Sequence, residues 1–267
     1  MSFAVASAIE PLGERAGQRL FRADFPDGWQ QGPGAFGGLV LGTLLRAMQA
    51  VEPDAARRPR TLSGELCAPV LVGPAELAVR VLRRGARQTN VACELRQGGE
   101  VLATTSAILS LSRPQPDASA VETPPPSGDW RATAIVPAMP APAYPVFTAH
   151  YEYRSDGRGM LELGQPDALG WIRERATLAA LDAPAVIGRL DAWWPCVFAF
   201  EGRPRPVTTV TFSAQLLCDP ATLPADEPLR YRARIAALQD GFFLEARELW
   251  RGDRPVAFNQ QTFAILK

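Results

Sequence analysis

The chain has 267 residues, enough for one large domain or two ordinary ones, and can bury a sizeable core. Lys and Arg together number 28, and Asp and Glu also number 28, so the formal net charge is zero. With no long basic tract to follow a phosphate backbone, this composition argues against nucleic-acid binding.

The first residues do not predict a targeting segment. The start, MSFAVASAIEPLGERAG, has no basic region, and its short apolar stretch ends at Glu10, unlike a secretory signal. The longest apolar run, residues 36–51, is interrupted by Arg46 and is too short to cross a membrane.

The cysteines show no C-x-x-C spacing, which favours buried thiols over disulfides or a zinc site; they are Cys67, Cys93, Cys196 and Cys218. We therefore expect a cytoplasmic protein with no membrane partner.

A glycine-rich stretch, WQQGPGAFGGLVLGTLLRAM, carries the pattern G-x-G-x-x-G at Gly32, Gly34 and Gly37. In dinucleotide-binding proteins this pattern follows a buried strand, and an acidic residue stands about 20 residues further on. Here the preceding residues are polar and interrupted by proline and glycine, and Asp54 lies in a proline-interrupted loop, so the context does not fit. We expect a helix from Gly37 to about Val51, apolar on nearly every face and therefore buried all round.

Strands follow this helix. TLSGELCAPV (residues 61–70) predicts one strand, and residues 75–111 predict three more, with turns at RRGAR and QGGE. The next stretch is dense in proline, alanine and serine and predicts an extended connector. We therefore expect an N-terminal domain over residues 1–113, a linker over 114–147 and a C-terminal domain over 148–267.

The second half begins at the only histidine, His150, in FTAHYEYR, where alternation predicts a strand start. A histidine-based triad or hydratase would have to use it, but we interpret it as a partly buried strand residue. A helix is expected over residues 167–192 and a strand over 207–220. Residues 229–266 then repeat the pattern of three strands and two turns.

The two three-strand segments superimpose without a gap. The matched positions are Val81 and Ile235, Glu94 and Glu248, Gly98 and Gly252, and Ala103 and Ala257. Such matching indicates an internal duplication.

Each half is predicted to contain a strand, a long buried helix and an antiparallel meander, and this order resembles the hotdog fold. Because the order occurs twice, the chain more closely resembles the double-hotdog acyl-CoA thioesterases of the bacterial thioesterase II type. The segments that carry this resemblance are GPGAFGGLVLGTLLRA, RRGARQTNVACELRQGGEVLATTSAIL, RLDAWWP and PVAFNQQTFAIL. The resemblance implies an α+β double hotdog in which two antiparallel sheets each wrap a long central helix. It also implies hydrolysis of acyl-CoA to free acid and CoA, with no metal and no cofactor.

The family's hydrolytic water is held by an Asp, a Thr and a Gln, which the resemblance places at Asp191 in GRLDAWWP, Thr209 in PVTTVTF and Gln261 in AFNQQTF. Asp191 would act as general base, and the other two would orient the water. Alternatively, Asp191 is a surface turn residue.

The register around these residues is open. The family often has Asp-His after the threonine, whereas this chain has Thr211 followed by Phe212, so Thr208, Thr209 and Thr211 all compete. Gln260 competes with Gln261, although alternation lets only one of them face the helix.

The resemblance also places Gly37 and Gly38 at an open helix N-terminus, where N–H groups favour the oxyanion of a thioester carbonyl. Alternatively, these glycines only allow close packing. Trp193 and Trp194 would line the substrate cavity, form core or form an interface. Glu65 is interpreted as an ordinary charged strand residue. The last strand of the first half has no Gln or Asn, so this half is expected to be the degenerate copy.

Two other functions remain as alternatives. The first is a non-catalytic double hotdog that binds acyl-CoA or another apolar ligand, and the second is a hydratase on the same fold. For the thioesterase we expect acyl-CoA as substrate and assembly into a homo-oligomer.

Overall fold

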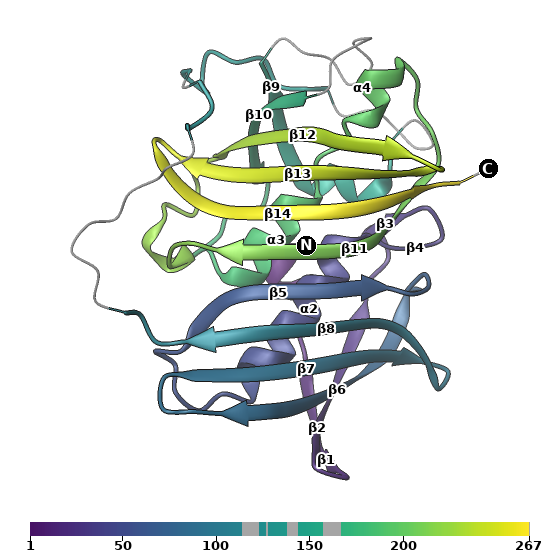
Figure 1. Ribbon diagram of the computed structural model, residues 1–267, viewed down its shortest axis with the longest axis vertical. Coiled ribbons are helices and arrows are strands. Elements are labelled where there is room, and N and C mark those ends of the chain that lie inside the picture. Colours follow the sequence, from purple (N-terminus) through teal and green to yellow (C-terminus); the bar gives the residue numbers. More distant parts are fainter. Residues whose placement is uncertain (114–122, 127, 138–143, 157–166, 267) are drawn as a thin grey trace.

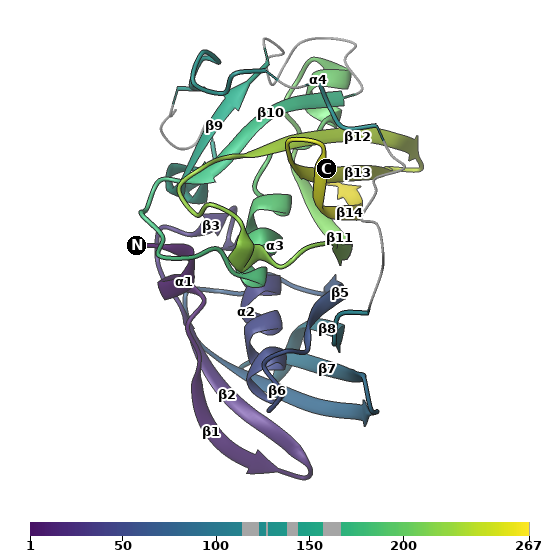
Figure 2. The ribbon, with the colours of Figure 1, turned by 90° about the vertical axis from the view of Figure 1, so that its left-hand side faces the viewer.

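A curved antiparallel sheet runs the length of the molecule, and two helices lie against one of its faces (Figures 1 and 2). The structure, a computed structural model, describes residues 1–113, 123–126, 128–137, 144–156 and 167–266. The first half contains α1 (Phe3–Ala6), β1 (Glu10–Arg15), β2 (Gln18–Phe25), β3 (Gln30–Gln31), β4 (Gly34–Ala35), α2 (Gly37–Ala50), β5 (Arg58–Leu66), β6 (Gly73–Arg84), β7 (Gln88–Gln97) and β8 (Glu100–Ser110). The second half contains the 3-10 helix η1 (Val146–His150), β9 (Tyr151–Ser155), β10 (Asp167–Glu174), α3 (Ala183–Asp191), α4 (Val197–Glu201), β11 (Val207–Leu216), the 3-10 helix η2 (Pro220–Thr222), β12 (Leu229–Gln239), β13 (Phe242–Arg251) and β14 (Arg254–Ile265).

The strand order of the first half recurs in reverse in the second half, on the other side of the centre of the sheet. Within the described residues it contains twelve strands, in the order β1-β2-β6-β7-β8-β5-β11-β14-β13-β12-β10-β9. At the centre β5 pairs with β11, and Ser63 lies opposite Ser213. Two sheets were expected, but this pairing joins the halves into one, because an open strand edge offers backbone groups that another strand satisfies. The α+β class and the antiparallel sheet are confirmed.

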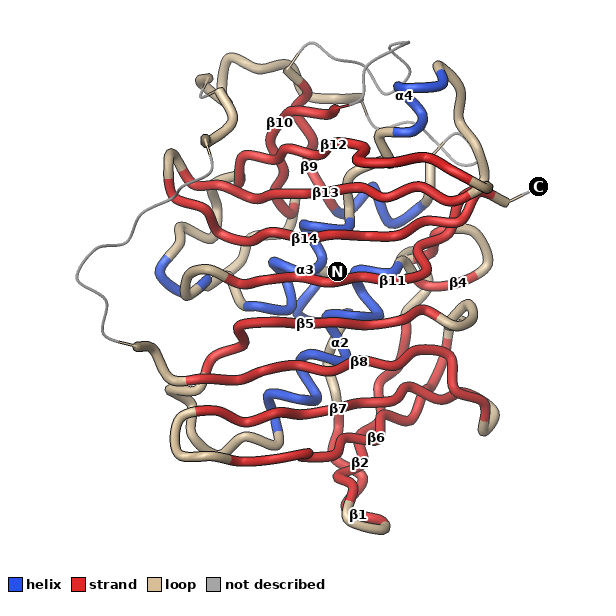
Figure 3. Tube along the Cα trace, viewed as in Figure 1, coloured by secondary structure: helices blue, strands red, loops and turns tan. Residues whose placement is uncertain are grey.

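Helix α2 is buried on nearly all sides. Ten of its fourteen residues are buried, as its all-round apolar sequence predicts. Figure 3 shows α2 and α3, in blue, crossing behind the central strands. Gly42 permits the close packing of α2 against its neighbours, because a Cβ there would lie 2.7 Å from Phe3 Cζ and 3.0 Å from the carbonyl oxygen of Pro184.

The helix expected over residues 167–192 is wrong in its first part. Asp167–Glu174 form β10, which pairs with β9 and β12, and only Ala183–Asp191 are helical. Trp171 and Ile172 are buried in this sheet, so pairing and packing override the local helical pattern. Helix α3 instead begins after Asp182, whose carboxylate accepts the N–H of Ala185 at 2.8 Å.

The duplication extends to the irregularities of the strands. Both tight turns carry a glycine with positive φ, +59° at Gly98 and +60° at Gly252. The register also shifts at matched places in the two halves: Val81/Arg83 and Ile235/Ala237, Leu95/Arg96 and Leu249/Trp250, and Pro59/Thr61 and Thr209/Thr211. Because β-bulges are specific features of a fold, their recurrence supports duplication of one unit.

His150 connects the two halves of the chain. It ends η1, and β9 begins at the next residue. Its ring stacks on Trp29 with 3.9 Å between centroids, and its Nε2 lies 2.9 Å from the carbonyl oxygen of Gly28. Burial lowers the pKa of His150. These contacts give the histidine a structural position between the halves.

The glycine pattern at residues 32–37 does not form a dinucleotide-binding turn. Its first glycines belong to the turn and to β4 of the β3–β4 hairpin, which leads into α2 without a parallel strand. Throughout the part of the chain that the structure describes, no helix is long and apolar enough to span a membrane.

Candidate active site

A largely apolar cavity of about 670 Å³ lies where the two halves meet. The first half contributes the start of α2 and the end of β5, and the second contributes the end of α3 with the beginning of β11. The lining residues that matter below are Gly37, Leu66, Val136, Asp191, Thr209 and Arg247. The cavity therefore brings together residues that are far apart in the sequence.

Asp191, the last residue of α3, lies beside this cavity with its side chain only 6% exposed. The Gly38 N–H and the Gln261 side chain lie close enough to act to lower the pKa of its carboxyl. Nη1 of Arg247 lies 3.8 Å from Asp191 Oδ1. The structure thus places Asp191 in a buried polar cluster and not on the surface.

The start of α2 meets Asp191 at very short range. Its N-cap, Phe36, supplies no side-chain hydrogen bond to the first N–H groups. A Cβ on Gly37 would lie 2.9 Å from Asp191 Oδ2, and one on Gly38 would lie 2.9 Å from Asp191 Cβ. Only glycine allows this approach, so the glycines have a packing role and also bring the positive end of the helix to the carboxylate.

Thr209 and Gln261 are neighbours, and the structure resolves their register. Thr209 Oγ1 donates to Gln261 Oε1 at 3.3 Å, and Gln261 Nε2 donates to Asn259 Oδ1 at 2.9 Å. Gln261 is fully buried, whereas Gln260 is exposed on the other face of β14. The bulge after Thr209 turns β11 locally, and Thr211 on its far side is exposed.

The two tryptophans occupy different environments. Trp193 is a core residue, 2% exposed, and stacks on Tyr231 with 4.7 Å between ring centroids. Trp194 is half-buried, and both rings line the cavity. Core, cavity wall and interface were the expected alternatives, and the structure places Trp193 in the core with both residues also lining the cavity.

Sequence reasoning missed a buried ion pair on β13, Glu245 and Arg247. Both side chains are at most 1% exposed, and Arg247 Nε donates to Glu245 Oε1 at 2.8 Å. The repeat contained a signal for them, since the matched positions in the first half are the apolar Val91 and Cys93. Charges at inward positions of a strand are exceptional and could have been singled out.

At the matched positions the first half does not carry the polar residues of the second half. Matching the repeats places Ala107 at the position of Gln261, Cys93 at that of Arg247 and Pro59 at that of Thr209. Glu65 is exposed on β5 and is not among the residues lining the cavity. The first half therefore contributes the start of α2 and the end of β5 to this cavity.

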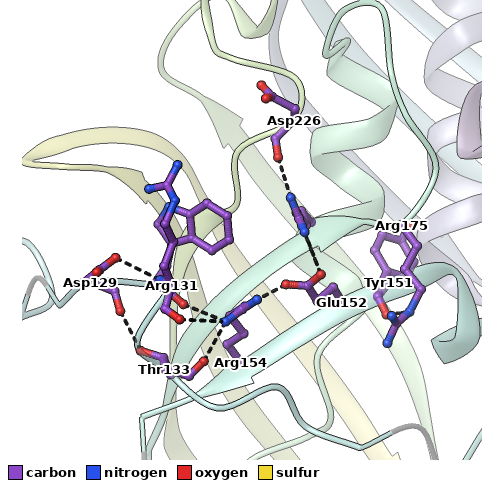
Figure 4. Close-up of polar contacts among 10 residues, drawn as sticks. Asp129, Arg131, Thr133, Tyr151, Glu152, Arg154, Arg175 and Asp226 are labelled. Carbon is purple, nitrogen blue, oxygen red and sulfur yellow. Dashed lines mark hydrogen bonds and ion pairs between the residues drawn. The ribbon is translucent and has the colours of Figure 1, made fainter.

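The described part of the linker forms one wall of the cavity. The Val136 N–H donates to the carbonyl oxygen of Tyr153 at 2.8 Å, and Val136 lines the cavity. Arg154 on β9 also binds this part of the linker (Figure 4): its Nη1 donates to the carbonyl oxygen of Thr133 at 2.8 Å, and its Nε forms an ion pair with Glu152 at 2.7 Å. The Arg154 guanidinium also lies over Trp130, 5.1 Å from the ring centroid. The remaining linker residues, 114–122, 127 and 138–143, lie outside the described chain.

Burial controls the titration of the carboxyls at this site. It raises the pKa of Asp191 above the ordinary 3.8, and the charge of Arg247 opposes this rise only in part. Burial likewise raises the pKa of Glu245. For Arg247, burial acts to lower the pKa, but the neighbouring Tyr231, Glu245 and Asp191 outweigh it and raise the pKa.

The raised pKa of Asp191 predicts a pH-dependent effect on stability. A carboxyl whose pKa rises on folding stabilises the fold below its unfolded-state pKa, and this contribution is lost as the pH rises through the folded-state pKa. Asp191→Asn should therefore melt at a higher temperature than the wild type at neutral pH, and the difference should shrink toward acid pH. Thermal melting from neutral to acid pH tests the sign of the stability difference between variant and wild type. If the variant were less stable than the wild type at neutral pH, the charge of Arg247 would outweigh the effect of burial on Asp191.

Comparison with known proteins gives matches along nearly the whole chain. The family model described as the acyl-CoA thioesterase N-terminal domain matches residues 25–110, and the one described as the acyl-CoA thioesterase C-terminal domain matches residues 117–265. No curated protein matches the sequence.

Solved structures share the arrangement of elements. A conserved protein of unknown function with hot dog fold from Alicyclobacillus acidocaldarius is 23% identical with a TM-score of 0.87. The tesB protein of Mycobacterium avium subs. paratuberculosis is 17% identical and the acyl-CoA thioesterase II TesB2 of Mycobacterium marinum is 16% identical, each with a TM-score of 0.75. In all three cases the alignment covers 99% of this chain and 98% of the other. These likenesses show the hotdog fold.

Proposed function

Because the chain belongs to the acyl-CoA thioesterase family and is a thioester hydrolase, we propose that it splits acyl-CoA with a water held by Asp191, Thr209 and Gln261. One observation carries this proposal. A possible base, two polar side chains and the start of a helix converge beside one largely apolar cavity. The cavity suits an acyl chain, and the polar cluster suits the reacting carbonyl.

In the proposed reaction the water lies between the Asp191 carboxylate and the Gln261–Thr209 pair. Its oxygen bonds to the thioester carbon while Asp191 takes one proton. The carbonyl oxygen becomes an oxyanion that faces the start of α2, where N–H groups and the helix dipole stabilise it. As the oxyanion collapses, the C–S bond breaks and Asp191 returns the proton to the CoA thiolate. The products are the free acid and CoA.

The closeness of the Gly38 N–H to Asp191 has a role in this proposed reaction. In the free protein a Cβ on Gly38 would lie 2.9 Å from Asp191 Cβ, and the Gly38 N–H acts to lower the pKa of the carboxyl. A neutral carboxyl is a weaker acceptor than a carboxylate, so proton uptake by Asp191 releases this N–H when the oxyanion forms. The same helix start therefore supports the ionised base first and the oxyanion afterwards.

The non-catalytic alternative is separated from the enzyme by one experiment. The purified chain is mixed with acyl-CoAs of increasing length, and the released thiol is measured with a colour reagent. We expect hydrolysis that is saturable in acyl-CoA and depends on chain length, since the cavity has a finite volume of about 670 Å³. Acyl-CoA binding without thiol release in any member of the series would instead establish a binding protein.

A hydratase gains no support from the described residues. Its histidine would be His150, which is stacked on Trp29 and placed against the carbonyl oxygen of Gly28, and it is not among the residues lining the cavity. We further propose that the protein is cytoplasmic and forms a homo-oligomer; sedimentation velocity would test the oligomeric state.

A further inference from the structure

We propose that Arg247, held by Glu245, is a positioning residue that fixes the Asp191 carboxylate in place and balances its charge. This inference rests on the proposed function, because it concerns the residue assigned there as the base. It adds two residues of β13 to a site otherwise composed of Asp191, Thr209, Gln261 and the start of α2.

Arg247 binds the C-terminal end of α3, where Asp191 is located. Its Nη1 donates to the carbonyl oxygens of Leu190 at 3.1 Å and Asp191 at 2.9 Å. These are carbonyls at the helix C-terminus, where a cation also complements the helix dipole. The same nitrogen lies 3.8 Å from Asp191 Oδ1. One guanidinium therefore orients both the backbone and the side chain of the proposed base.

Glu245 holds Arg247 from the opposite side and connects it to the cavity wall. Its Oε1 accepts from Arg247 Nε at 2.8 Å, and its Oε2 accepts from the Cys196 N–H at 2.8 Å. Cys196 follows the Trp193–Trp194–Pro195 segment, whose residues line the cavity. The pair thus joins the base to the substrate wall through four hydrogen bonds within the described residues.

The internal repeat shows that the fold does not need this pair. The matched strand β7 has Val91 and Cys93 at these two positions, and both are buried. Burying a charge costs several kcal/mol unless its partners compensate. The charges occur in the half that also has Gln261, and the half with Ala107 at that position lacks them. The presence of the pair in the half that carries Asp191 and Gln261, and its absence from the other half, point to a role in the site.

Titratable groups on three strands interact with Asp191. The acidic groups that face it are the phenols of Tyr151 and Tyr153 on β9, the phenol of Tyr231 on β12, and Glu245 on β13. Burial raises the pKa of each of these phenols further above 10, so they stay neutral at working pH. Glu245 adds negative charge, and Arg247 is the cation that opposes it.

The geometry predicts opposite pH effects for the two members of the pair. Arg247→Met removes a positive charge beside Asp191, so the acid limb of the kcat profile should move to higher pH. Glu245→Gln removes a negative charge from the same cluster, so the limb should move to lower pH. Arg247→Lys retains the charge and should keep the limb near its wild-type position. A merely structural role would lower kcat without moving the limb.

The experiment measures kcat against pH for these variants, with thermal melting to confirm folding. At the pH where the wild type is half active, Arg247→Met should lose about 10²-fold in kcat, the usual effect of a misplaced catalytic group. Arg230→Met is the matched control. Arg230 is also a buried arginine, but it pairs with Asp156 and lies over Trp171, so its loss should affect stability without moving the limb.

Two outcomes are distinguishable. If Asp191→Asn loses turnover while Arg247→Met and Glu245→Gln leave the acid limb in place, the positioning role is wrong and the proposed function stands. If Asp191→Asn retains turnover, the proposed mechanism itself is wrong. Should Arg247→Met fail to fold, the downward shift in Glu245→Gln and the unchanged limb in Arg247→Lys still decide the question.

Discussion

Asp191→Asn is expected to lower acyl-CoA turnover by roughly 10²–10⁴-fold, the usual contribution of a positioned general base. Asparagine keeps the size of the side chain, but it accepts no proton from water. Acyl-CoA binding should survive, because the proposed role of the carboxylate is toward the water and not the nucleotide. Steady-state thiol release measures turnover, and calorimetric titration measures binding.

Comparison with Gln261→Ala makes this result specific. Gln261 would orient the water but provides no basicity, so its loss should reduce turnover less than Asp191→Asn. The double variant should lose less than the product of the two single effects, because both residues act on one water. Independent, multiplicative losses would indicate that the residues serve different steps.

The contrary result is equally clear. If Asp191→Asn remains folded and turns over acyl-CoA at the wild-type rate, the carboxylate is not the base. The phenols of Tyr151 and Tyr153 do not replace it readily, since burial raises the pKa of both well above 10. The water would then have to be activated elsewhere along the cavity.

Gly37→Ala is expected to lower turnover by about 10²-fold while leaving the protein folded. The new Cβ would lie 2.9 Å from Asp191 Oδ2 and 3.0 Å from Leu66 Cδ1, which are the ends of side chains that can move aside. The fold should tolerate this, because alanine favours a helix over glycine by about 1 kcal/mol. The carboxylate cannot move without leaving its place beside the water. Turnover and thermal melting, measured together, test this separation.

Gly42→Ala is the matched control in the same helix. Its Cβ would lie 2.7 Å from Phe3 Cζ and 3.0 Å from the backbone oxygen of Pro184, on the side of α2 that packs against α3. We expect a loss of about 1–3 kcal/mol in stability from overpacking, with normal turnover per folded molecule. If both variants behaved alike, the start of α2 would serve only packing.

The hairpins and the buried helix could be predicted because their signals are local. Turn glycines with positive φ, as at Gly98 and Gly252, and a helix apolar on every face identify their elements without reference to the rest of the chain. The strand over residues 167–174 could not be predicted, because it depends on two flanking strands, one of which comes more than fifty residues later. A local pattern was outweighed there by pairing across the sheet.

The candidate site was likewise predictable only in part. The resemblance implied Asp191, Thr209 and Gln261 as candidates, and strand alternation already allowed only one of Gln260 and Gln261 to face inward. The bulge at Thr209 and the contact of its hydroxyl with Gln261 came only from the structure. Arg247 was overlooked because a single arginine in a strand is ordinarily a surface residue.

By itself, the sequence determined the duplicated unit, its turns and its buried helix α2, whereas the family resemblance supplied the residues proposed to hold the water. Only the tertiary structure decided that β5 pairs with β11 and that the start of α2 from the first half meets Asp191 from the second. It also decided that the Glu245–Arg247 ion pair lies next to Asp191. The physical reason is distance along the chain. Periodicity and turn chemistry act between near neighbours, whereas Gly37 and Asp191 are brought together only when the completed sheet packs α2 and α3 against each other.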